Sequence, residues 1–255
     1  MRVVEDDLGR PVVLPGEPRR VVSLVPSLTE TVAVTLPGVL VGATAWCTHP
    51  GDLDLRRVRG TKNPDLAAIT ELAPDLVLAN EEENRPGDLD ALQEAGLAVY
   101  VTRIRSVEEA LASLARLLAA CGAPDVPWLE EASAAWGAVE PVGARRLRAL
   151  VPIWRRPWMA LGRDTFAGDV LRRLGVDSVL GDSAERYPRF DPARVPDVDL
   201  VVLPDEPYAF SAADGPEAFP GVPYALVDGR SLTWYGPSLA AAPHRLRGLL
   251  SAATP

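Results

Sequence analysis

The alternation of short apolar runs with amphipathic stretches is the sequence feature that most restricts the possible folds of this chain. In its N-terminal part the runs at 21–25, 39–43, 75–79 and 97–102 have the length of buried strands. The stretches between them place apolar residues at helical spacing. Such alternation favours a layered α/β fold with a largely parallel sheet.

The middle of the chain has a different pattern. From Ser106 the sequence reads SVEEALASLARLLAACG, with Glu109 at the capping-box position and apolar residues at helical spacing. A second helical stretch covers 127–139. The alternation then resumes, with strands predicted at 147–153, 200–203 and 224–227 and helices at 165–174 and 239–250.

This pattern predicts three parts in one chain. They are an N-terminal α/β lobe over 1–105, a helical connector over 106–143 and a C-terminal α/β lobe over 144–255. The two lobes also repeat a segment of the form Pro-Asp-x-aliphatic, in APDLVL and VPDVDLVV.

Charge and composition exclude several functions. The net charge is −9 and no dense basic patch occurs, so we expect no nucleic-acid partner. Two cysteines are too few for a disulfide framework. The N-terminus is acidic and rich in proline and lacks the apolar core of a secretion signal. We therefore expect a cytoplasmic monomer, or a periplasmic or other extracytoplasmic protein if a leader was removed.

Polar residues follow the predicted strands of the first lobe. Because loops at the carboxyl ends of parallel strands share one edge, these residues form a candidate ligand surface. Ser27 or Thr29 caps the first helix or hydrogen-bonds a ligand. The remaining candidates are Trp46, Lys62, Asn63, Glu81, Glu83 and Arg85.

Cys47 and His49 lie two residues apart in the loop after the second strand. Both side chains are ligands for soft or borderline transition metals. A bare metal ion held by Cys47, His49 and the acidic run 81–83 is thus one hypothesis. A second hypothesis is that Cys47 is a buried packing residue and His49 a loop residue that hydrogen-bonds the backbone. A third hypothesis is catalysis, with Cys47 as nucleophile and His49 as its base. No further residue that would orient the histidine is evident, and no hydrolase, P-loop or zinc-protease motif occurs. We therefore predict that the protein is not an enzyme.

Aromatic residues dominate the corresponding positions of the second lobe. Flat rings and guanidinium groups stack on large planar ligands. The candidates are Trp154, Trp158, Arg163, Tyr187, Trp234 and Tyr235.

Several of these segments carry a family likeness. The runs RVVSLVPSLTETVAVTLPGVLVGATAW, LAAITELAPDLVLAN and FAGDVLRRLGVDSVLGD, and the ending SLTWYGPSLAAAPHRL, occur in this order. Together they resemble the class III, helical-backbone periplasmic-binding-protein-like family, and most closely its cobalamin-binding members. The likeness covers about residues 20–250.

The resemblance implies two Rossmann-like lobes with mostly parallel sheets, joined by a rigid long helix, with a ligand in the cleft between them. Cobalamin, haem, an iron-siderophore or a transition metal ion is the implied cargo, and no cofactor is required. An ABC-importer membrane subunit is the implied partner. Such proteins dock through one acidic residue on each lobe, but here Ala67 and Phe190 or Asp191 occupy those places, with Asp65 and Asp191 as shorter neighbouring acids.

Overall fold

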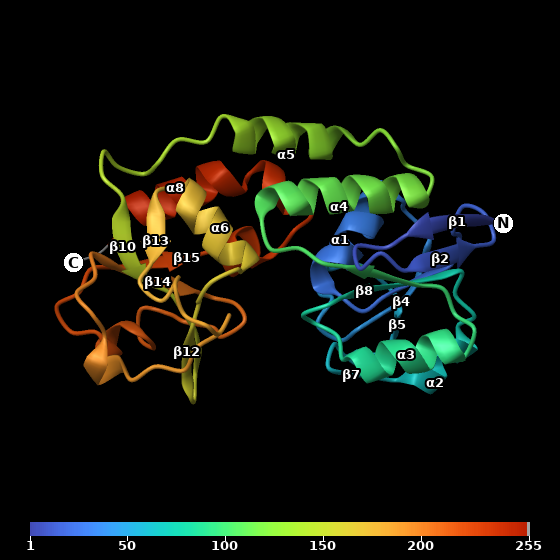
Figure 1. Cartoon of the computed structure of the whole chain (residues 1–255), viewed down its shortest axis with the longest axis horizontal. Coiled ribbons are helices and arrows are strands. Elements are labelled where there is room, and N and C mark those ends of the chain that lie inside the picture. Colours follow the sequence, from blue (N-terminus) through green and yellow to red (C-terminus); the bar gives the residue numbers. More distant parts are fainter. Residues whose placement is uncertain (254–255) are drawn as a thin grey trace. The chain divides into compact units, whose positions relative to one another are not determined.

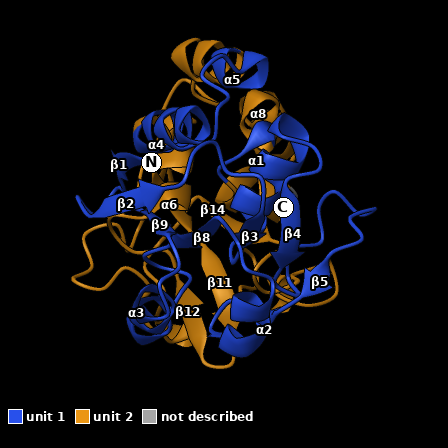
Figure 2. Ribbon diagram, turned by 90° about the vertical axis from the view of Figure 1, so that its right-hand side faces the viewer, with its two compact units in different colours: residues 1–104, 109–130, 235–237 blue, residues 105–108, 131–234, 238–255 orange. Residues whose placement is uncertain are grey.

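The computed structural model describes residues 1–253 and divides them into two compact units. Unit 1 contains residues 1–104, 109–130 and 235–237. Unit 2 contains residues 105–108 and 131–234, and then 238 to the end of the described chain (Figure 2). The units interleave in sequence, since the chain leaves and re-enters each of them. The boundaries predicted at 105 and 143 stay a prediction.

A parallel sheet forms the centre of unit 1. Its strands lie in the order β5 (Arg56–Arg57), β4 (Leu40–Ala43), β3 (Val21–Ser23), β8 (Leu76–Asn80) and β9 (Val99–Thr102). Each neighbouring pair is parallel. This confirms the α/β class and the four strands expected here, with ends that differ by one or two residues.

Burial on both faces explains why these strands are almost wholly apolar. All five residues of β8 are buried. Val77 and Ala79 share a core with Ile69 of α2 (Leu66–Glu71) and Leu89 of α3 (Pro86–Glu94). Leu76 and Leu78 alternate with them and therefore point to the opposite face. Strands with two buried faces are typical of parallel sheets covered by helices.

One capping prediction in this region is wrong. Helix α1 covers Pro26–Thr35, and its N-cap, Val25, makes no side-chain capping bond. Ser27 and Thr29 lie inside the first turn and are buried. The Thr29 hydroxyl contacts the Val25 carbonyl and the Cys47 sulfur instead. Pro26 at the first helical position supplies the correct φ without a capping side chain.

Unit 2 has a second parallel sheet (Figure 1). Its strands lie in the order β13 (Val176–Ser178), β10 (Leu147–Leu150), β14 (Leu200–Pro204) and β15 (Tyr224–Val227). Helix α6 (Phe166–Arg173) contacts β13, and helix α8 (Ala242–Ser251) contacts β15. Two parallel sheets, one in each unit, confirm the predicted α/β class, while the rigid long helix between the lobes stays a prediction.

The predicted strand 147–153 is two elements. β10 ends at Leu150, and β11 (Pro152–Arg155) then turns into an antiparallel hairpin with β12 (Trp158–Ala160). The terminal helix is also shorter than predicted, because a 3₁₀ turn at Pro237–Ala240 precedes α8. Short hairpins at β1–β2 (Arg2–Glu5 and Pro11–Leu14) and β6–β7 (Arg59–Gly60 and Asn63–Pro64) were not predicted.

Two helices occupy the stretch expected to be helical in the middle of the chain. Helix α4 covers Val107–Ala120 and helix α5 covers Pro127–Gly137. The chain passes from unit 1 to unit 2 within α5, between Glu130 and Glu131.

Strand order places a switch point in each sheet. In unit 1 the chain goes from β3 to β4 on one side and later to β8 on the other. In unit 2 it goes from β10 to β13 on one side and then to β14 on the other. Ligands of open α/β sheets bind outside the carboxyl ends of strands at such switch points. We define the unit 1 rim as residues 24–27, 44–49, 80–84 and 235–237, and the unit 2 rim as residues 151–158 and 205–217.

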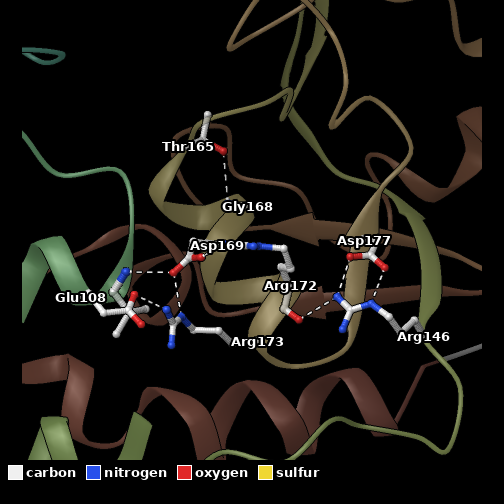
Figure 3. A network of polar contacts seen from close by, with 9 residues as sticks. Glu108, Arg146, Thr165, Gly168, Asp169, Arg172, Arg173 and Asp177 are labelled. Carbon is white, nitrogen blue, oxygen red and sulfur yellow. Dashed lines mark hydrogen bonds and ion pairs between the residues drawn. The ribbon is translucent and has the colours of Figure 1, made fainter. Parts of the chain in front are cut away.

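A buried carboxylate holds the start of α4 in unit 2 (Figure 3). Asp169 of α6 is 5% exposed and accepts a hydrogen bond from the Val107 backbone N–H at 3.0 Å. It also pairs with Arg172 and Arg173, and Arg173 pairs in turn with Glu108. Burial alone would raise the pKa of Asp169, but the bonds from Arg173, Val107 and Arg172 outweigh it and lower the pKa below its usual value.

We expect Asp169→Ala to destabilise the protein by about 3 kcal/mol, because it leaves buried donors without their shared acceptor. Urea unfolding at pH 7 measures the change. Asp177→Ala is the control, since it removes a half-exposed partner of Arg146 and should cost less than about 1 kcal/mol. An equal loss of unfolding free energy in the two variants would contradict the structural role assigned to Asp169.

Candidate functional site

A carboxyl–phenol pair lies in the unit 1 rim. Glu83 follows β8, and Tyr235 reaches unit 1 through the short segment 235–237. The Tyr235 hydroxyl donates to Glu83 Oε1 at 3.2 Å. The phenol is 6% exposed and the glutamate is half-buried. The structure thus joins two predicted ligand residues that are 152 positions apart.

Burial changes the acidity of both groups. Desolvation raises the pKa of Glu83 to about 7, and the neighbouring Glu82 charge adds to this, while the Tyr235 hydrogen bond and Lys62 oppose it. Burial, followed by the Glu83 charge, raises the pKa of Tyr235 well above its usual value. The phenol therefore stays a hydrogen-bond donor, and the carboxyl group changes its charge near neutral pH.

Gly236 allows the 235–237 segment to approach helix α1. A Cβ added there would lie 2.9 Å from Thr31 Oγ1 and 3.1 Å from the Ser27 carbonyl oxygen. Glu30 Oε2 would lie 3.6 Å from the same Cβ. The absence of a side chain thus lets Tyr235 reach the rim beside Ser27, which is itself 3% exposed.

Cys47 is a packed, hydrogen-bonded thiol. It is fully buried, and its sulfur lies 2.9 Å from Thr29 Oγ1 and 3.1 Å from Thr44 Oγ1. Burial raises the pKa of the thiol, and these hydrogen bonds only partly offset the shift. A thiol with a raised pKa is a poor nucleophile at neutral pH.

His49 and most of the remaining first-half candidates lie nearer the solvent. His49 Nδ1 contacts Thr48 Oγ1 at 3.2 Å. Lys62 Nζ donates to the Glu82 carbonyl at 2.5 Å, which ties the β6–β7 turn to the rim. The exposed candidates of this half are Trp46, Lys62, Asn63, Glu81 and Arg85. Among residues 1–253, no group of three or more His, Cys, Asp or Glu side chains is placed to hold a metal ion.

The unit 2 rim presents an aromatic and ionic surface on the β11–β12 hairpin. Trp154 is 42% exposed and meets Tyr208 edge to face at 5.8 Å between ring centroids. Arg155 pairs with Asp214 and Glu217, and the Tyr208 hydroxyl donates to Asp214 at 2.6 Å. These contacts fix the hairpin and leave part of the Trp154 ring open to a ligand.

Trp158 belongs mainly to the core of unit 2. Its ring stacks on Phe210 at 6.0 Å and meets Phe190 and Phe219 at 5.8 and 5.5 Å. The Arg155 guanidinium lies 5.2 Å from its centroid. Trp158 therefore packs the β11–β12 hairpin against the aromatic core of unit 2.

Trp234 follows β15 through the short helix α7 (Gly229–Thr233). It is 7% exposed, donates from Nε1 to Glu206 Oε2 at 2.9 Å and lies under Arg230. Arg163 is exposed just beyond β12, and Tyr187 is half-buried in the loop after β13.

A cavity of about 380 Å³ opens in unit 2 at the carboxyl ends of β14 and β15. Its polar wall consists of Asp205, Asp228 and Arg245, and its apolar wall includes Leu203, Phe210 and Leu249. Asp205 and Asp228 are engaged by the backbone N–H groups of Gly229 and Ser231.

Sequence reasoning missed several residues of these rims. Tyr208, Asp214 and Glu217 lie in an irregular loop after β14, where no periodic pattern marks them. The one available signal was their place just beyond a strand at a switch point. Thr44 was missed because a buried polar residue at a strand end resembles ordinary packing in sequence.

Comparisons with known proteins agree on the type of fold. The vitamin B12-binding protein of Pectobacterium carotovorum subsp. carotovorum (strain PC1) is 24% identical over 180 residues, which is 68% of this chain and 65% of the relative. An uncharacterized ABC transporter substrate-binding lipoprotein, YvrC of Bacillus subtilis (strain 168), is 34% identical over 125 residues, or 47% and 40% of the two chains. The matched region thus spans less than two thirds of these relatives. No family model matches the chain.

Solved structures cover more of the chain. The periplasmic vitamin B12-binding protein BtuF of Vibrio cholerae aligns with a TM-score of 0.75 and 19% identity, over 92% of this chain and 98% of the other. The periplasmic haem-binding protein BhuT, in complex with two haems, aligns with a TM-score of 0.76 and 26% identity, over 91% and 97%. Within the described residues, no helix is both long and apolar enough to cross a membrane.

We expect Glu83→Gln to stabilise the protein at pH 8 by up to about 3 kcal/mol, because the native carboxylate is charged in a desolvated place. The folded pKa is about 7 against an ordinary 4.5, so the folded state binds more protons between these values. The penalty therefore grows as pH rises from 4.5 towards 7 and is constant above.

Urea unfolding of the native chain and the variant between pH 5 and pH 8 measures this difference, which should be small at pH 5. Glu81→Gln, an exposed neighbour with the same charge change, is the control and should show no such trend. A constant difference across the range would show that Glu83 is not desolvated.

Proposed function

Because the chain belongs to the class III periplasmic-binding-protein family, we propose that it binds a corrinoid or a related metal chelate as the cargo of an ABC importer. In each unit, taken by itself, the candidate ligand-contacting side chains lie at the carboxyl-end rim of the sheet. Haem and iron-siderophores are the other members of this ligand class. No resident cofactor is needed for such a role.

One observation carries the proposal. Trp154 on the unit 2 rim is 42% exposed and offers an indole face to a planar chelate. The unit 1 rim, taken by itself, holds the Glu83–Tyr235 pair. A planar ring stacks on an indole, and its polar periphery requires hydrogen-bond partners. The vitamin B12-binding and haem-binding relatives are named for ligands of this shape.

The thiol chemistry considered from the sequence lacks support in the rim. Cys47 is buried and its pKa is raised, and His49 contacts Thr48. The comparisons identify non-enzymatic binding proteins, and we assign no catalytic residue.

The importer partner is part of the proposal, and its docking residues differ from the expected glutamates. Ala67 is exposed on α2, and Asp65 beside it caps that helix through the Ala68 N–H. Asp191 caps a 3₁₀ turn through the Ala193 N–H. If these aspartates dock on a membrane subunit, they do so from capped and therefore well-ordered positions. The cytoplasmic location predicted from the N-terminus stays a prediction, while the relatives are described as periplasmic proteins or a lipoprotein.

Ligand binding by the full chain tests the proposal. We expect cyanocobalamin or haem to raise the melting temperature, as mass action requires of a ligand that binds the folded state, and to change the ligand's visible spectrum. Trp154→Ala should weaken binding about fivefold, the loss of one stacking contact.

Trp128→Phe is the matched control for loss of an indole, because Trp128 lies on α5 and bonds Thr35 rather than facing a rim. It should leave the affinity unchanged. Absence of binding to cyanocobalamin, haem and ferric siderophores alike would overturn the proposed function.

A further inference from the structure

We propose that Arg57 is a positioning residue of the unit 1 rim, whose guanidinium holds the β4–β5 loop so that Trp46 presents its indole to a flat ligand. This loop covers residues 44–55 and lies wholly within unit 1. The inference rests on the proposed function and adds a stacking side chain to this rim. Three observations support it.

The first observation is an indole that is open to solvent. Trp46 is 67% exposed, although tryptophan side chains are on average highly buried. One edge of the ring lies against the β6–β7 hairpin, because a Cβ added to Gly60 would lie 3.3 Å from Trp46 Nε1 and 2.6 Å from Asn63 Oδ1. Gly60 thus leaves the space that this edge of the ring occupies. The exposed part of the ring is available to stack on a planar ligand.

The second observation is a fork of hydrogen bonds from Arg57 to the backbone of the loop. Nη1 donates to the Cys47 carbonyl at 2.8 Å and to the Thr44 carbonyl at 3.2 Å. Nη2 donates to the Leu53 carbonyl at 3.3 Å. The first two carbonyls flank Trp46 in sequence. A planar guanidinium can serve separate carbonyls from two nitrogens, whereas the ammonium of lysine has a single nitrogen.

The third observation is that the main chain around Trp46 has further anchors. The Ala45 N–H donates to the Arg59 carbonyl at 2.7 Å, and the Thr48 N–H donates to the Trp46 carbonyl at 3.0 Å. The Cys47 side chain is fully buried and contacts two threonine hydroxyls. An indole on a fixed main chain has much of its orientation set before a ligand arrives, so less conformational entropy is lost on binding.

A double-mutant cycle in the full chain tests whether Arg57 acts through Trp46. With cyanocobalamin as probe, or haem if cyanocobalamin does not bind, we expect Trp46→Ala to weaken binding about fivefold and Arg57→Ala about threefold. In the Trp46→Ala background, Arg57→Ala should change the affinity by less than about 1.5-fold, because the indole through which it acts is gone. Titration calorimetry measures all four affinities.

Two further variants separate the fork from the charge. Arg57→Lys keeps the positive charge but lacks the second donor nitrogen, so we expect it to bind as weakly as Arg57→Ala. Arg56→Ala is the matched control, because it removes the same charge from the adjacent exposed position. It should leave the affinity unchanged.

Hydrogen exchange of the ligand-free chain measures the anchoring by itself. We expect Arg57→Ala to speed exchange of the Cys47 and Thr48 amides about tenfold, because it releases the carbonyls that hold this turn. Exchange of the Val77 amide in β8 should be unchanged, which also shows that the variant is folded.

Three results would overturn the inference and leave the proposed function intact. The first is an Arg57→Ala loss of affinity that is the same with and without Trp46, and the second is full rescue by Arg57→Lys, since either would indicate that Arg57 acts on the ligand directly. The third is unchanged exchange at Cys47 and Thr48. If the native protein binds neither cyanocobalamin nor haem nor ferric siderophores, the proposed function fails, and the role of Arg57 in binding fails with it even if exchange is faster.

Discussion

Every residue of β8 and of β14 is buried, and this double-sided burial governs the rest of the structure. A strand covered on both faces cannot present a ligand site along its length. Only the ends of such a strand are accessible to a ligand, and the strand order decides which end is left uncovered. The switch points between β3 and β8 and between β10 and β14 leave their carboxyl ends open. In each unit the candidate ligand residues therefore lie in a narrow rim at these ends.

The two rims differ in the kind of side-chain interaction that they offer. In unit 1 the rim is a buried polar cluster, in which Glu83 and Tyr235 share one hydrogen bond and the backbone of α1 lies against Gly236. In unit 2 the rim is aromatic, and the ions around Arg155 hold the hairpin that carries Trp154. A polar cluster distinguishes ligands by donors, acceptors and charge, whereas an indole face contributes contact area with little chemical selection.

Much of the fold was predictable from sequence, because apolar runs of strand length and amphipathic stretches of helical length leave few architectures. The limits of that reasoning are equally physical. The sequence LRALVPI reads as one strand, but Pro152 cannot donate to a ladder, and the chain leaves the sheet there for a hairpin. The site was predictable only as a list of strand-end residues. No periodicity indicates that Tyr235 crosses to unit 1 to meet Glu83, because a pairing of residues so distant in sequence depends on tertiary packing. For the same reason Trp158 and Cys47 could not be separated from ligand residues until their neighbours were known.

Because residues 235–237 belong to unit 1, the chain cannot be divided into its two units by one cut. Any cut between residues 83 and 235 puts Glu83 and Tyr235 on different fragments, since the two are 152 positions apart. A chimaera that exchanged only the N-terminal half with a homologue would inherit a foreign carboxylate under a resident tyrosine. An exchange of segments that is meant to keep this pair must therefore include both the region around Glu83 and residues 235–237.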